Sequence, residues 1–138
     1  MASRIWILAA GVIGALAIIA DAASRHLVAG DPTRLDFLAL GARYGLIHAL
    51  ALLGLAALGR SIATTIAGFC FLAGSIGFCG SLIARALGAP PGFSLLTPVG
   101  GTLLIVGWLV LALSALASGR ASHPLRGNSA GHRDEGRP

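Results

Sequence analysis

The sequence contains no lysine, and its acidic residues are few. Asp and Glu together account for five of its 138 residues, and charged residues make up 11% of the chain, against about 25% in a soluble domain. The ten basic residues are all arginine, and they are scattered along the chain with no basic face. The composition therefore excludes a water-soluble domain, and it favours no nucleic-acid partner despite the net charge of +5.

Cysteine is also scarce. Cys70 and Cys79 fall within one apolar run, and a separation of nine residues places them on opposite sides of a helix. They cannot form a disulfide within that helix, and no Cys or His residues have the spacing of a metal site. We therefore expect two free thiols, no metal and no cofactor.

Long hydrophobic runs are what the sequence has in abundance. Hydrophobic residues make up 56% of the chain, with a mean hydropathy of +0.86. Because a membrane span needs roughly 20 apolar residues, the chain has room for about four. We predict an all-α, integral membrane, antiparallel four-helix bundle over residues 1–118, with a disordered polar tail over residues 119–138. The expected spans are residues 5–23, 41–58, 62–87 and 98–117.

Residues typical of helix ends mark three of these helices. Asp31 followed by Pro32 predicts a helix start, and Gly59 predicts the end of that helix after Leu58. Ser61 is the expected N-cap of the third helix, and Thr97-Pro98 repeats the start pattern for the fourth. The first apolar run has two interpretations, a retained span or a signal peptide cleaved near residues 20–22. We favour a retained span, because a discarded segment needs no packing face.

Small residues at helical spacing predict the faces that pack. Lipid tails are as apolar as leucine, so helices in a bilayer associate through close backbone approach and interhelical hydrogen bonds. The expected packing residues are Gly11 and Gly14 in the first span, Gly74, Gly77 and Ser81 in the third, and Gly100 and Gly107 in the fourth.

Polar residues are predicted to gather at one mouth of the bundle. With four antiparallel spans, the ends of the first and third spans and the starts of the second and fourth share one membrane face. The candidate residues there are Asp21, Arg25, His26, Arg43, Tyr44, His48 and Arg85. Asp21 is expected to form an ion pair with Arg25, Arg43 or Arg85, because a buried carboxylate needs a partner. His48 is expected to be a neutral hydrogen-bond clamp between helices, and the arginines have the alternative of extending to the headgroups.

The stretch from Tyr44 to Trp108 resembles a bacterial membrane family called domain of unknown function 423, to which small eukaryotic four-span proteins are related. The matching residues are Arg43-Tyr44, His48-Ala49-Leu50, Ala67-Gly68-Phe69, Gly74, Gly80-Ser81-Leu82, Thr97 to Gly101, and Gly107-Trp108. Where the first span of the family ends in a G-A-F-G-A-H-like motif, this chain has residues 21–26, with the histidine kept and the glycines replaced. The resemblance implies a four-helix membrane protein of the inner membrane or an organelle, and it implies no activity.

No motif in the chain specifies a reaction. The first hypothesis is a non-enzymatic interaction or accessory protein whose partner is another membrane protein, a second copy or lipid. The alternative is permeation or proton-linked transport of a small solute, with Asp21 and His48 as titrating groups. A membrane enzyme using His26 and His48 ranks third. The resemblance implies a bacterial inner membrane location, and the arginine distribution favours both termini in the cytoplasm.

Overall fold

The computed structural model describes residues 2–27 and 30–120, which form four long helices and one short 3₁₀ helix. The elements are α1 (Ala2–Leu27), α2 (Pro32–Leu58), α3 (Ile62–Ala86), η1 (Pro91–Leu95) and α4 (Leu96–Arg120). The long helices have 25 to 27 residues each, about 38 to 40 Å, so each is long and apolar enough to cross a membrane. The four-helix membrane class is confirmed. Of the expected tail over residues 119–138, residues 119 and 120 belong to α4 and the rest lies outside the described residues.

Two helix starts follow the capping pattern that the sequence predicts. The Asp31 carboxylate accepts hydrogen bonds from the backbone N–H groups of Thr33 and Arg34, both at 3.1 Å. Ser61 forms a capping box with Thr64, in which each side chain accepts from the other residue's backbone. Gly59 ends α2 with a φ of 82°, a conformation that favours glycine.

The fourth helix starts differently from the expectation. The 3₁₀ helix η1 leads directly into α4 at Leu96, so Thr97 is inside the helix and is not its cap. Its hydroxyl instead lies 2.7 Å from the Ser81 hydroxyl of α3. This hydrogen bond joins α3 and α4 next to their connection, which explains why a hydroxyl residue occupies this position.

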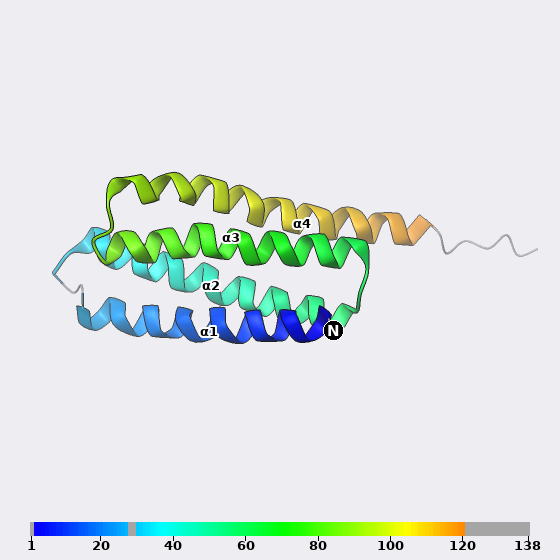
Figure 1. The fold of residues 1–138 in the computed structure, drawn as a ribbon, viewed down its shortest axis with the longest axis horizontal. Helices are drawn as coiled ribbons and strands as arrows, with labels where there is room; N and C mark the ends of the chain where they lie inside the picture. The colour runs from blue at the N-terminus through cyan, green and yellow to red at the C-terminus, as the bar shows by residue number, and fades with distance from the viewer. Residues whose placement is uncertain (1, 28–29, 121–138) are drawn as a thin grey trace, which may run out of the picture.

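The four helices run antiparallel in chain order, and each packs mainly on its neighbours in the sequence (Figure 1). α1 packs along α2, α2 along α3, and α3 along α4, while α1 meets α3 at few positions. Within the described residues, the α4 backbone makes no close approach to α1 or α2. The bundle is therefore open at its sides, with α1 and α4 as its outer helices.

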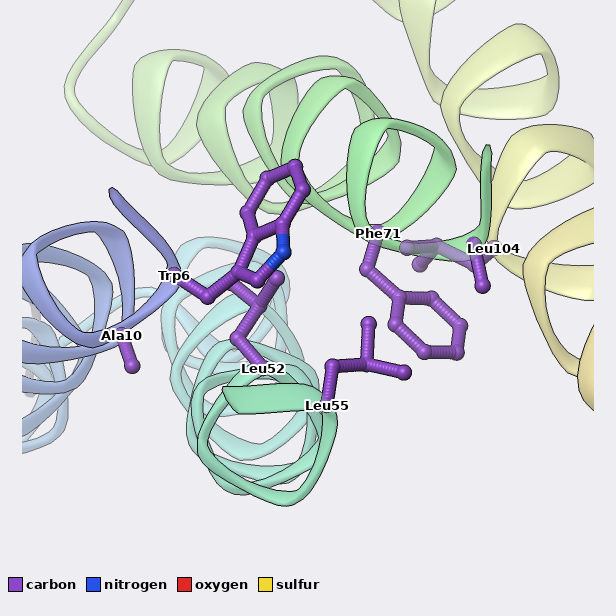
Figure 2. Close-up of a cluster of buried hydrophobic side chains, with 7 residues drawn as sticks. Trp6, Ala10, Leu52, Leu55, Phe71 and Leu104 are labelled. Atoms are coloured by element: carbon purple, nitrogen blue, oxygen red, sulfur yellow. The ribbon is translucent and has the colours of Figure 1, made fainter. Parts of the chain in front are cut away.

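Large apolar side chains fill the interior where the helices meet. Leu52 and Leu55 of α2 and Phe71 of α3 are 0–2% exposed, and Trp6 of α1 and Leu104 of α4 close the cluster on either side. Figure 2 shows the Trp6 ring reaching over Leu52 while Leu55 faces Phe71. This part of the bundle is a packed core.

The seam between α3 and α4 is built from the small residues predicted for it. A Cβ on Gly100 would lie 2.6 Å from the Gly77 carbonyl carbon and 2.9 Å from the Gly74 carbonyl oxygen. A Cβ on Gly107 would lie 2.6 Å from the Phe71 ring. The structure places Gly74, Gly77, Ser81, Gly100 and Gly107 where α3 and α4 meet, in agreement with the packing face expected from their spacing.

The packing face predicted for α1 is wrong at Gly11. No atom of another helix lies within 4 Å of a Cβ placed there, and Gly14 makes only an ordinary contact, 3.7 Å from the Ala49 Cβ. The buried face of α1 consists of Trp6, Ala10, Ala17, Ala20 and Ser24. Small residues occur on both sides of this helix, and the side with Trp6 buries more surface.

Sequence reasoning also missed three glycines where other helices approach closely. A Cβ on Gly68 would lie 2.5 Å from the Trp6 indole, and one on Gly45 would lie 3.1 Å from the Ala17 Cβ. At Gly41 the nearest atoms belong to Ile83 and to the Cys79 carbonyl, at 3.1 and 3.2 Å. Gly41 and Gly45 let α2 pack closely on α3 and α1, and Gly68 lets Trp6 of α1 pack on α3.

Candidate functional site

The predicted polar residues do not form one cluster in the structure. Figure 1 shows the ends of α1 and α3 meeting the starts of α2 and α4 at a single end. α2 runs between two separate hollows. One is shared with α1 near this end, and the other is shared with α3 and α4 near the middle of the helices. The single polar mouth expected from the span count is therefore divided in two.

The first hollow, which we name the arginine recess, lies between α1 and α2. It has a volume of about 430 Å³ and is lined only by these two helices. Its polar residues are Asp21, Ser24 and Arg25 of α1 and Arg43 of α2, and its apolar residues are Leu35, Ala39, Ala42 and Leu46. Asp21, Arg25 and Arg43 are exposed, so the recess opens outward from the bundle.

The ion pair predicted for Asp21 is absent. Among residues 2–27 and 30–120, a single ion pair is found, between Arg34 Nε and Asp31 Oδ2 at 3.9 Å. Asp21 shares the recess with Arg25 and Arg43, yet none of these three charged side chains makes a hydrogen bond or ion pair with the described part of the chain. The structure instead holds the Asp21 and Arg43 side chains exposed along the recess, without a contact between their charged groups.

Arg85 and His26 belong to neither hollow. The Arg85 guanidinium donates a 2.8 Å hydrogen bond to the Ala89 carbonyl, which satisfies a backbone group just beyond the end of α3. His26 is exposed in the last turn of α1. The Arg85 side chain therefore stabilises the turn that follows α3. His26 lies outside both hollows.

The second hollow, which we name the aromatic groove, lies between α2 and α4 over α3. It has a volume of about 320 Å³. Its lining residues are Tyr44, Ile47 and His48 of α2, Phe78 of α3, and Gly101, Leu104, Ile105 and Trp108 of α4. Because the α2 and α4 backbones do not meet, side chains form its floor.

His48 connects α2 to α4 at the floor of the aromatic groove. Its Nδ1 lies 2.8 Å from the Tyr44 carbonyl oxygen, which can only accept, so Nδ1 carries the hydrogen. Nε2 is then an acceptor, and the Trp108 Nε1–H donates to it over 3.4 Å, a long hydrogen bond. Both ring nitrogens of His48 have partners in this arrangement, one on α2 and one on α4.

Aromatic rings surround this histidine. The Tyr44 ring is nearly parallel to it, at 15° and a centroid distance of 6.3 Å, and the Phe71 centroid lies 5.5 Å away. Phe71 also contacts Trp108 at 5.0 Å, and Phe78 meets Tyr44 edge-on at 5.2 Å. The indole N–H of Trp108 lies in the middle of α4 and needs an acceptor, and His48 on α2 supplies one.

The two hollows separate the residues that a transport or acid–base mechanism would combine. Asp21 lines the arginine recess and His48 lines the aromatic groove, so the structure does not bring them together. No group of three or more His, Cys, Asp or Glu residues able to hold a metal ion is found in the described ranges. The geometry offers lateral binding surfaces with aromatic and cationic walls.

Comparison with known proteins gives a family model and a set of membrane proteins. The model described as "Protein of unknown function (DUF423)" matches residues 20–101. The UPF0382 inner membrane protein YgdD of Escherichia coli (strain K12) is 31% identical over 121 residues, which cover 84% of this chain and 92% of that protein. No solved structure matches the chain.

Staphylococcal relatives match over a shorter stretch. A UPF0382 membrane protein of Staphylococcus epidermidis is 40% identical over 75 residues, 53% of this chain and 62% of the relative. Another, from Staphylococcus aureus, is 38% identical over 73 residues, 51% of this chain and 60% of the relative. The chain thus spans about three fifths of these two relatives and nearly all of the Escherichia coli one, and its four apolar helices agree with their description as membrane proteins. The chain belongs to the DUF423 family of multi-pass membrane proteins.

Proposed function

We propose that this protein is a non-enzymatic accessory protein of the membrane that receives a transmembrane helix of another membrane protein in its aromatic groove. The observation that carries the proposal is the groove itself, a hollow of about 320 Å³ between two helices whose backbones do not meet. The packed core around Phe71 and Leu52 leaves the sides of the bundle as its binding surfaces.

The chemistry of the groove favours a helix over an acyl chain as its occupant. Small residues and polar side chains are what drive helix association in a bilayer, and the groove wall contains Gly101 and Tyr44. The Tyr44 side chain is 38% exposed, and its hydroxyl makes no hydrogen bond with the described residues. A partner helix offers an acceptor to this hydroxyl, whereas a lipid tail offers none.

The proposal also includes the orientation of the protein in the membrane. Both ends of the helical region lie at the end of the bundle opposite the arginine recess (Figure 1). In the sequence, six of the ten arginines stand near the start of α1, between α2 and α3, or at and after the end of α4 (Arg4, Arg60, Arg120, Arg126, Arg133 and Arg137). The excess of basic residues on the cytoplasmic side in membrane proteins supports termini in the cytoplasm.

A photo-crosslinking amino acid at Ile105, on the groove wall, is expected to form an adduct with another membrane protein in cells. The same amino acid at Val106, at the same depth but outside the groove, is expected to give lipid adducts only. Filling the groove with Ile47→Trp is expected to abolish the Ile105 adduct. Leu53→Trp is the matched control. Leu53 lies outside the groove and is as exposed as Ile47, at 44%.

The crosslinks are read by mass spectrometry of the purified adducts. Equal protein adducts at positions 105 and 106, or an adduct that Ile47→Trp leaves unchanged, would contradict the proposal. An adduct whose mass is that of two copies of this chain would assign the groove to self-association and contradict it as well.

A further inference from the structure

We infer that the arginine recess binds the phosphate group of a membrane phospholipid through Arg25 and Arg43. This inference does not rest on the proposed partner groove, because no residue lines both hollows. The recess has a volume of about 430 Å³ and opens on the side of the α1–α2 hairpin. Two guanidinium groups line it without a hydrogen bond or ion pair to the described residues.

The depth of the two arginines matches that of a headgroup. Arg25 is in the last turn of α1, and Arg43 lies about 16 Å along α2 from its start. α2 is about 40 Å long, about 10 Å more than the hydrocarbon core, so its first turns stand at the interface. Arg43 and Arg25 line the same recess, and an arginine below the interface can extend its side chain to the level of the headgroups.

The walls of the recess match the rest of a phospholipid. Leu35, Ala39, Ala42 and Leu46 follow one another along α2, from the headgroup level toward the middle of the membrane. They form an apolar track beside Arg43 that an acyl chain can contact. A phosphate with an attached hydrocarbon chain therefore complements the recess better than a free phosphate ion does.

The net charge of the recess decides which headgroups bind best. Arg25 and Arg43 contribute two positive charges and Asp21 one negative charge, which leaves an excess of one positive charge. Guanidinium groups bind phosphate oxygens through charge-assisted hydrogen bonds. An anionic lipid such as phosphatidylglycerol is therefore expected to bind more tightly than phosphatidylcholine, whose cationic group has no free partner except Asp21.

Titration of the full chain in detergent, followed by native mass spectrometry, tests the inference. The probes are phosphatidylglycerol, phosphatidylcholine and inorganic phosphate. The Arg25→Gln/Arg43→Gln double variant is expected to bind phosphatidylglycerol about tenfold or more weakly, and Arg25→Lys/Arg43→Lys is expected to keep part of the affinity. Asp21→Asn is expected to bind it about twofold more tightly, because a negative charge leaves the recess.

The control is Arg4→Gln/Arg60→Gln, which removes the same charge from the other end of the bundle. Equal losses in the two glutamine double variants, or a wild-type chain without preference for phosphatidylglycerol, would overturn the inference. So would an Asp21→Asn affinity that stays the same or falls. Inorganic phosphate that binds as tightly as the lipid would assign the recess to a soluble anion and overturn the lipid assignment.

Discussion

Replacing Gly100 with alanine is expected to lower the free energy of unfolding by about 3 kcal/mol, the upper end of the cost of overpacking. The new methyl group would lie 2.6 Å from the Gly77 carbonyl carbon and 2.9 Å from the Gly74 carbonyl oxygen. These are backbone atoms and cannot rotate away, so α4 must move off α3 along the seam. Reversible unfolding in mixed micelles, followed by tryptophan fluorescence, measures the change.

Gly11→Ala is the matched control for this substitution. It also replaces a helical glycine within a membrane span, but no atom lies within 4 Å of the new Cβ. The unfolding free energy is expected to stay unchanged or to rise, because alanine favours helix over glycine by about 1 kcal/mol. Equal losses at positions 11 and 100 would contradict the assignment of the α3–α4 seam.

Replacing Phe71 with alanine is the second change with a large expected effect. Phe71 is 0% exposed and contacts His48, Trp108 and the seam at Gly107. In a bilayer the transfer of apolar surface from water contributes little, so the main cost is the cavity. A cavity of roughly 100 Å³ at about 24 cal/mol per Å³ lowers the unfolding free energy by about 2.4 kcal/mol.

The Phe71→Ala variant is also expected to loosen the link between α2 and α4. Without the Phe71 ring, the Trp108 indole loses a neighbour at 5.0 Å, and its hydrogen bond to His48 is no longer held in place. Phe69→Ala is the control, because Phe69 is 60% exposed and its main ring contact is edge-on to Trp6. A Phe69→Ala loss as large as that of Phe71→Ala would contradict the packed core.

Helix ends were the most predictable part of the fold. Asp31, Ser61 and Gly59 act through their own or adjacent backbone groups, so a few residues of sequence contain the whole interaction. The start of α4 shows the limit of this reasoning. Thr97 has the side chain of a typical helix cap, but its hydroxyl is hydrogen-bonded to Ser81 on the neighbouring helix. The residues next to Thr97 in the sequence do not indicate this partner.

Packing faces were predictable where one side of a helix holds the small residues. α3 and α4 approach closely enough that the glycines at positions 77 and 100 are required, and their spacing predicts this. α1 has Gly11 on one side and Ala10 and Ala17 on the other. Hydrophobicity cannot predict which side of α1 packs against the other helices, because lipid and protein core are equally apolar. The side with Trp6 packs inward because the Trp6 ring fits over Gly68, and these two residues are far apart in the sequence.

The polar residues do not form the single group that the sequence predicted, and His48 lies near the middle of the bundle. The span count places them at one membrane face, whereas the rotation of each helix about its axis decides which neighbour each one meets. Arg43 and Tyr44 are adjacent in sequence, yet they line different hollows. One residue turns a helix by about 100°, and this separates the arginine recess from the aromatic groove.

The openness of the bundle is the central claim, and disulfide crosslinking in native membranes tests it most directly. In a Cys70→Ala/Cys79→Ala background, Ser81→Cys/Thr97→Cys is expected to form a disulfide readily, because the native hydroxyls lie 2.7 Å apart. Val12→Cys/Leu109→Cys, which pairs the outer helices α1 and α4, is expected to form none within a protomer. Rapid disulfide formation between α1 and α4 in a single chain, or its failure between α3 and α4, would contradict the account.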